Sequence, residues 1–114
     1  MSAPLWLTPN WPAPASVSAL STTRQGGVSS GVYASLNLGS HVGDAIAAVE
    51  QNRALLQQHA ALPQAPAWLN QVHGIAVLDL DQWQGQLADA DASVTSIPGL
   101  AAVVMTADCL PVLF

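Results

Sequence analysis

The sequence predicts a mixed helix-and-strand fold, and three observations support this. Of the 114 residues, 51% are hydrophobic, which is enough to bury a core in one domain. One segment, from Asp44 to Pro63, has apolar residues at helical spacing. Short alternating or apolar runs bounded by glycine and proline lie on both sides of it, as is typical of strands. We therefore expect one helix among several short strands.

The chain before the helix is expected to be extended. Residues 1–16 are rich in proline, which forbids a helix but allows an edge strand or an extended arm, anchored by Trp6 and Trp11. Residues 17–23 alternate and predict a strand. That strand leads into residues 24–31, whose glycines and serines indicate a loop.

The helix has a start signal, an apolar face and a stop signal. Asp44 is a good N-cap residue, and Pro63 cannot continue a helix. The predicted apolar face consists of Ile46, Val49, Leu56 and Leu62.

Four further strands are expected after the helix. Residues 67–72 and 75–80 predict a hairpin with His73 and Gly74 at its tip. Residues 92–95 and 101–106 predict two more strands. We expect the last one to bend at Asp108 and Cys109, because a carboxylate is costly to bury without partners.

Charge and cysteine content exclude several functional classes. The net charge is −5, with two arginines and no lysine, so we expect no nucleic acid partner and no membrane partner. One cysteine cannot form an intramolecular disulfide, and the first ten residues lack a signal-peptide pattern. These features predict a soluble, cytoplasmic protein and leave its oligomeric state open.

His73 and Cys109 are the first candidates for chemistry. A lone cysteine in an apolar run is usually a buried hydrophobe, and a histidine in a turn is usually only solvated. If the fold brings the two together, their nitrogen and sulfur donors suit Zn²⁺, or Cu as a second possibility. A catalytic zinc site needs a third protein ligand, which His41, His59 or residues outside this chain would supply. His59, late in the helix, is better explained as a surface residue.

The remaining charged residues have simpler explanations. Arg24 precedes two glycines and is a candidate contact for a phosphate or carboxylate, although a surface ion pair explains it equally well. Arg53 is expected to pair with Glu50 along the helix. Asp89 and Asp91 are interpreted as ordinary solvated acids.

Seven short motifs stand out over residues 20–114. They are Thr22-Thr-Arg-Gln-Gly-Gly-Val-Ser, Ser35-Leu-Asn-Leu-Gly, His41-Val-Gly-Asp, Glu50-Gln-Asn-Arg, Asn70-Gln-Val-His-Gly, Asp89-Ala-Asp-Ala and Thr106-Ala-Asp-Cys-Leu-Pro. In order and spacing they resemble the bacterial laccase-like, or multicopper polyphenol oxidase, family, whose members are also described as purine nucleoside phosphorylases or a peptidoglycan editing factor.

The resemblance implies an architecture and a site. The fold class would be α+β, with a mixed β-sandwich core and flanking helices, similar to cysteine-hydrolase-like toxin domains. Family zinc is held by two histidines and one cysteine, and His73 and Cys109 match two of these ligands. The resemblance also implies phosphorolysis of adenosine, inosine and methylthioadenosine, and deamination of adenosine. Arg24 would contact the anion, and Asn37 and His41 would be pocket residues.

Several alternatives stay open at this point. Family members are about twice as long, so residues 1–114 are expected to be the N-terminal portion of one laccase-like domain, inactive as a fragment. A cysteine hydrolase or amidase acting on peptidoglycan precursors would instead use a Cys109 thiolate activated by His73. A copper-dependent polyphenol oxidase ranks last, because three histidines cannot build a multicopper cluster.

Overall fold

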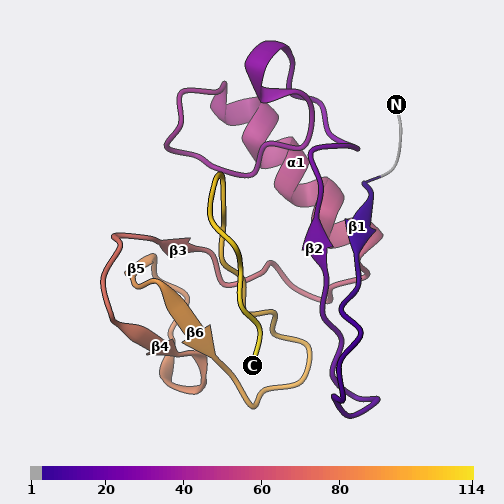
Figure 1. Ribbon diagram of the computed structural model, residues 1–114. Coiled ribbons are helices and arrows are strands. Elements are labelled where there is room, and N and C mark those ends of the chain that lie inside the picture. The colour runs from indigo at the N-terminus through magenta and orange to yellow at the C-terminus, as the bar shows by residue number, and fades with distance from the viewer. Residues whose placement is uncertain (1–3) are drawn as a thin grey trace. The chain divides into compact units, whose positions relative to one another are not determined.

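The computed structural model describes residues 4–114, which form two compact units, one that ends at His59 and one that runs from Ala60 to Phe114 (Figure 1). The described residues contain one α-helix, two 3-10 helices and three two-stranded sheets. This confirms a mixed fold of helix and short strands. No helix within residues 4–114 is long and apolar enough to cross a membrane.

The first unit begins with the predicted edge strand. Strand β1 (Trp6–Leu7) pairs antiparallel with β2 (Ser21–Thr22). The Thr23 N–H and hydroxyl both donate to the Leu5 carbonyl and extend the pairing by one position. Residues 1–3 of the predicted arm lie outside the described residues. A short 3-10 helix, η1 (Gly31–Tyr33), follows the glycine loop.

Helix α1 (Ile46–His59) is the predicted helix, with corrected ends. Val49 and Leu56 are buried as expected, whereas Ile46 is exposed and Leu62 lies beyond the helix. Asp44 is not the N-cap residue, because the helix begins at Ile46, one position later than an Asp44 cap requires. The Asp44 carboxylate accepts the Ala45 N–H instead. The helix ends before Pro63: Ala61 takes a left-handed conformation, with φ 54°, as is common just after a helix.

The second unit contains two parallel strand pairs. Strand β3 (Leu69–Asn70) pairs with β5 (Ala88–Asp89), and β4 (Val77–Asp79) pairs with β6 (Ala92–Val94). A 3-10 helix, η2 (Leu80–Gln82), follows β4. The predicted hairpin is therefore wrong, because both of its arms pair with the segment 88–94 and not with each other.

The predicted strand 101–106 is reduced to one parallel bridge between Ala67 and Ala102. The chain then bends over residues 107–109, which confirms the bend predicted at Asp108 and Cys109. The buried apolar side chains of the second unit are those of Ala67, Leu69, Leu80 and Ala90. Ala67 and Leu69 precede the His73 turn, Leu80 follows it, and Ala90 lies on the facing segment between β5 and β6.

Candidate functional site

His73 lies in a loop that bulges out from one of two parallel segments, the one formed by residues 69–79. Residues 69–79 run alongside residues 88–94, with Asn70 opposite Asp89 and Val77 opposite Ala92. Six residues, 71–76, therefore face only two, Ala90 and Asp91. The extra residues form the His73 turn, and the His73 side chain is exposed.

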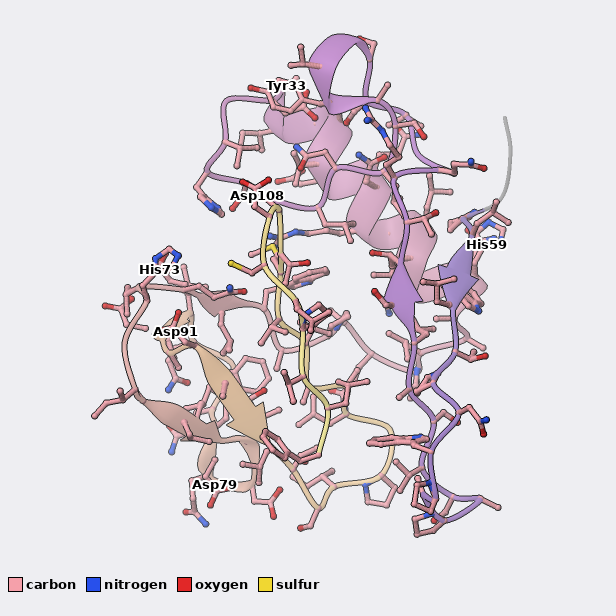
Figure 2. All side chains as sticks on the ribbon, in the orientation of Figure 1. Tyr33, His59, His73, Asp79, Asp91 and Asp108 are labelled. Atoms are coloured by element: carbon pink, nitrogen blue, oxygen red, sulfur yellow. The ribbon has the colours of Figure 1, made fainter. Side chains whose placement is uncertain are left out.

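The carboxylate of Asp91 fills this turn. One of its oxygens accepts the N–H groups of Val72 and His73, at 3.1 and 2.9 Å, and the other accepts that of Gly74 at 2.7 Å. Figure 2 shows Asp91 directly beside His73. The Gly74 N–H first, and then those of His73 and Val72, hold the pKa of Asp91 below its ordinary value. The interpretation of Asp91 as an ordinary solvated acid is wrong.

His73 itself adopts a left-handed backbone conformation, with φ 59°. This conformation is uncommon for a residue with a side chain, although histidine is among those that enter it more often. The three N–H groups donated to Asp91 stabilise the turn in this conformation. The backbone at His73 is therefore set by a side chain eighteen residues away.

Gln71 connects the His73 turn to the segment that leads to Cys109. Its side-chain nitrogen donates to the Met105 carbonyl at 2.9 Å, and its side-chain oxygen accepts the Met105 N–H at 2.6 Å. This two-bond pairing of an amide with a backbone imitates one step of a strand ladder. It joins Gln71, two residues before His73, to Met105, four residues before Cys109.

Cys109 is an exposed, free cysteine just after Asp108, which stands at the tip of the bend (Figure 2). The reading of Cys109 as a buried hydrophobe is thereby excluded. Neither its thiol nor the His73 imidazole forms a hydrogen bond to another of the described residues. Both donors suit zinc in kind. Residues 4–114 contain no cluster of three histidine, cysteine or acidic side chains that would complete a site.

Arg24 lies in the first unit, on a loop that Ser35 holds. The Ser35 hydroxyl accepts the N–H groups of Gly26 and Gly27, at 3.1 and 3.2 Å, and donates to the Arg24 carbonyl. The Arg24 Nε donates to the Ala34 carbonyl at 2.7 Å. No hydrogen bond within the described residues uses its two terminal nitrogens, and the side chain is exposed. This arrangement suits an anion contact.

Asn37 is used by its own loop. Its side chain exchanges hydrogen bonds with the backbone of Gly39 and donates to Asp44 at 3.2 Å. The Ser29 hydroxyl also donates to Asp44, and this bond, more than the one from Asn37, lowers the pKa of the carboxyl. His41 is exposed on the same loop.

The centre of the first unit is a polar side chain that the sequence did not single out. Asn52, on α1, is fully buried, accepts the Val28 N–H, and donates to the Ser29 hydroxyl and the Asn37 carbonyl, all at 2.8–2.9 Å. It thus holds both loops that carry candidate residues. The spacing of Val49, Asn52 and Leu56 on one helical face was the available signal.

Arg53 and His59 are the two remaining candidates, and Arg53 has a structural role. Arg53 donates from Nε to the Leu38 carbonyl at 2.9 Å, and burial lowers its pKa. It therefore supports the loop after Asn37. His59 is exposed at the end of α1, as its interpretation as a surface residue predicted.

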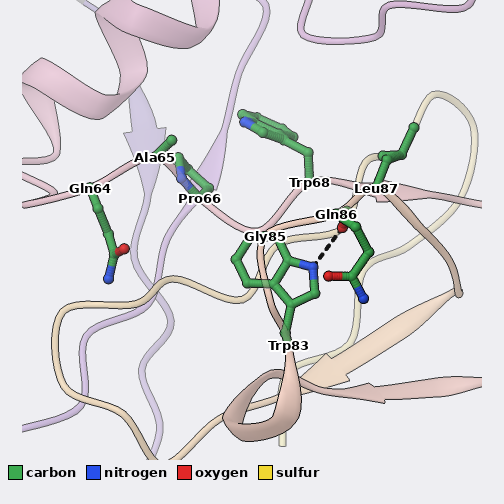
Figure 3. Close-up of a pocket in the computed structure, with 8 residues that line it drawn as sticks. All are labelled: Gln64, Ala65, Pro66, Trp68, Trp83, Gly85, Gln86 and Leu87. Carbon is green, nitrogen blue, oxygen red and sulfur yellow. Dashed lines mark hydrogen bonds between the residues drawn. The ribbon is translucent and has the colours of Figure 1, made fainter.

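The second unit also has a pocket of about 400 Å³ between residues 64–68 and 83–87. Two indole rings, Trp68 and Trp83, form much of its lining, with Gln64 and Gln86 at its polar parts (Figure 3). The Trp83 indole N–H donates to the Gln86 carbonyl at 2.6 Å. None of the candidate site residues lines this pocket.

Comparison with known proteins places the chain in a family. Residues 18–114 match the family described as multi-copper polyphenol oxidoreductase laccase. The chain belongs to this laccase family. It is 53% identical over 109 residues to a Pseudomonas aeruginosa protein named as a purine nucleoside phosphorylase, covering 96% of this chain and 43% of that protein. It is 52% identical over 108 residues to the purine nucleoside phosphorylase YfiH of Escherichia coli, covering 95% of this chain and 44% of that protein.

A solved structure shows the same fold. The crystal structure of a Neisseria meningitidis protein of family DUF152 superimposes with a TM-score of 0.84 and 53% sequence identity, covering 91% of this chain and 42% of that one. The chain therefore spans less than half the length of the relatives it matches. The resemblance seen in the seven motifs is confirmed.

Proposed function

We propose that the full-length protein is a zinc-dependent purine nucleoside phosphorylase. The observation that carries this proposal is the exposure of His73 and Cys109 on two segments that Gln71 ties together. The names of relatives that are 52–53% identical support the choice of reaction. We assign the activity to the whole protein, of which residues 1–114 would be the N-terminal portion of one laccase-like domain with a β-sandwich core.

In this proposal His73 and Cys109 are two of three zinc ligands, and the third lies outside this chain. The fit rests on donor chemistry: an imidazole and a thiol, both exposed and both without a competing hydrogen bond to the described residues. When bound, zinc supplies Lewis-acid chemistry, polarising an oxygen and acidifying a water near neutral pH. Copper is the second choice of metal.

The chain's own residues have defined tasks in phosphorolysis. Arg24 would hold inorganic phosphate through the two guanidinium nitrogens that its bond to Ala34 leaves available. A phosphate oxygen then attacks the ribose anomeric carbon, the bond to the purine nitrogen breaks, and the purine leaves with a proton. Asn37 and His41 are proposed to line the nucleoside pocket. The substrates would be adenosine, inosine and methylthioadenosine, and adenosine deamination would be a second activity of the same site.

Product formation tests the proposal. We expect the full-length protein to convert inosine and phosphate into hypoxanthine and ribose 1-phosphate. His73→Ala and Cys109→Ala should each lower kcat/KM at least about 100-fold, because a metal ligand matters more than the groups behind it. His59→Ala removes an exposed histidine that has no role in this proposal and should leave the rate unchanged. Full activity in Cys109→Ala would refute the assignment.

One observation favours a second candidate. Because the Cys109 thiol is exposed and free, it is also placed to act as a nucleophile in a hydrolase or amidase that acts on peptidoglycan precursors. Activity measured after removal of metal distinguishes the two functions. A nucleophilic cysteine would leave the purified protein active after complete removal of metal, whereas the phosphorylase would lose activity and regain it with zinc.

A further inference from the structure

The carboxylate of Asp91 has no role in the proposed reaction, yet it makes three hydrogen bonds to the His73 turn. We propose that Asp91 is the positioning residue that sets the direction of the His73 imidazole. The inference deepens the proposed function and rests on it, because it takes His73 as a metal ligand. Asp91 would never contact the metal or the substrate.

Strand pairing explains why this turn needs an external support. On either side of it the backbone of residues 69–79 bonds to residues 88–94, up to the Asn70 carbonyl before the turn and from the Ala76 carbonyl after it, but residues 71–75 have no strand partner there. Val72, His73 and Gly74 would then have to donate their N–H groups to water. Asp91 stands on the facing segment, between β5 and β6, and its one side chain reaches all three.

The identity of the acceptor matters as much as its position. A carboxylate offers two oxygens, both acceptors, and here one serves Val72 and His73 while the other serves Gly74. An asparagine in the same place has one acceptor oxygen and a donor NH₂ group, which would oppose at least one of the three N–H groups. Asp91→Asn should therefore loosen the turn, and Asp91→Ala should release it.

The backbone angle at His73 links the turn to the imidazole. At φ 59° the Cα–Cβ bond of His73 points in a different direction from the one it would have in an extended or helical backbone. Loss of the support lets His73 return to the common backbone regions, which moves the imidazole away from its place beside the other ligands. Groups that orient a metal ligand typically contribute a factor of 10 to 100 in metal affinity.

The experiment measures Co²⁺ binding to the full-length protein after its own metal has been removed. Cobalt replaces zinc in such sites and, with a thiolate ligand, gives a near-ultraviolet charge-transfer band that reports Cys109 directly. We expect Asp91→Asn to weaken Co²⁺ binding by about 10-fold and Asp91→Ala by up to about 100-fold, with the thiolate band still present at saturation. Amide hydrogen exchange at residues 72–74 should be faster in both variants.

Asp81→Asn is the matched control. The Asp81 carboxylate also accepts three hydrogen bonds in the same unit, from the Thr95 hydroxyl and from the hydroxyl and N–H of Ser96. Its loss should lower the melting temperature without changing Co²⁺ affinity. Equal losses of affinity in Asp81→Asn and Asp91→Asn would mean that Asp91 acts only through stability, and would overturn the inference.

The remaining outcomes separate the inference from the proposed function. If the wild type binds Co²⁺ and His73→Ala does not, unchanged affinity in both Asp91 variants overturns the inference alone. If the wild type shows no thiolate band, or His73→Ala binds as well as the wild type, the proposed metal site fails and the positioning role fails with it.

Discussion

In the first unit the loops are held by the side chain of a buried helical amide, whereas in the second they are held by one glutamine and by two acids, the exposed Asp81 and the half-buried Asp91, whose hydrogen bonds are open to solvent. Asn52 makes its three hydrogen bonds at zero exposure. Asp81 and Asp91 also make three each, but at the surface. The number of bonds is the same, and the surroundings differ.

The surroundings determine what each support contributes. When a buried partner is removed, the groups it served stay buried and unsatisfied, and each costs about 1–3 kcal/mol. When an exposed carboxylate is removed, water takes its place, and the loss shows in local geometry and in pH dependence instead. We therefore expect mutation of these supports to lower stability more in the first unit than in the second, where the shape of the turns changes as well.

The largest expected effect is that of Asn52→Leu. The substitution leaves the Val28 N–H, the Ser29 hydroxyl and the Asn37 carbonyl without their partner. We expect a loss of about 3–5 kcal/mol in the free energy of unfolding, which corresponds to a fall of about 10 °C in melting temperature for a protein of this family's length. Thermal and urea unfolding of the full-length protein measure it.

Asn70→Leu is the control for Asn52→Leu, because Asn70 is an exposed amide with one hydrogen bond, to Asp89. Its cost should stay below about 0.5 kcal/mol. Equal losses in the two variants would show that burial does not distinguish the two regions. Hydrogen exchange sharpens the comparison, since Asn52→Leu should accelerate exchange in residues 24–44 first.

Local patterns predicted the parts of the fold that local forces determine. The face of Val49 and Leu56, the extended proline-rich arm and the bend at Cys109 all follow from residue type and spacing, and the structure contains them. The C-terminal end of α1 was misplaced because Ala61, a good helix former, adopts the conformation that usually marks glycine.

Long-range pairing could not be predicted in the same way. His73 and Gly74 predicted a hairpin, but both neighbouring strands pair in parallel with residues 88–94, and no local signal encodes a parallel partner. For the same reason Asp91 could not be told from a solvated acid. The candidate residues His73, Cys109 and Arg24 came from the motifs, whereas their supports, Asp91, Gln71 and Ser35, needed coordinates.

The second largest effect is expected for Gln71→Ala, in the second unit. This substitution removes both hydrogen bonds to Met105, which are partly buried. We expect a loss of about 1–3 kcal/mol in the free energy of unfolding, less than for Asn52→Leu, because water reaches the freed backbone groups more easily. Gln64→Ala is the control: it removes one exposed bond of 3.4 Å to Gly99 and should cost less than about 0.5 kcal/mol. A loss in Gln71→Ala no larger than this would show that the pairing with Met105 contributes no stability.

The smallest effect, and the one that tests the charged character of the second unit, is the pH dependence of Asp81. The Ser96 hydroxyl first, then the Ser96 N–H and the Thr95 hydroxyl, lower the pKa of this carboxyl below its ordinary value. The unfolded chain therefore binds the proton at a higher pH than the folded chain does. The contribution of Asp81 to stability is fully present above the ordinary pKa of about 3.9 and is lost as the pH falls through the lower folded value.

Melting temperatures measured from about pH 6 to about pH 3 should fall less steeply for Asp81→Asn than for the wild type, and the two curves should converge at the acid end. Parallel curves would mean that the bonds from Ser96 and Thr95 hold the protonated acid as well as the carboxylate, and the contrast with the neutral support at Asn52 would then disappear.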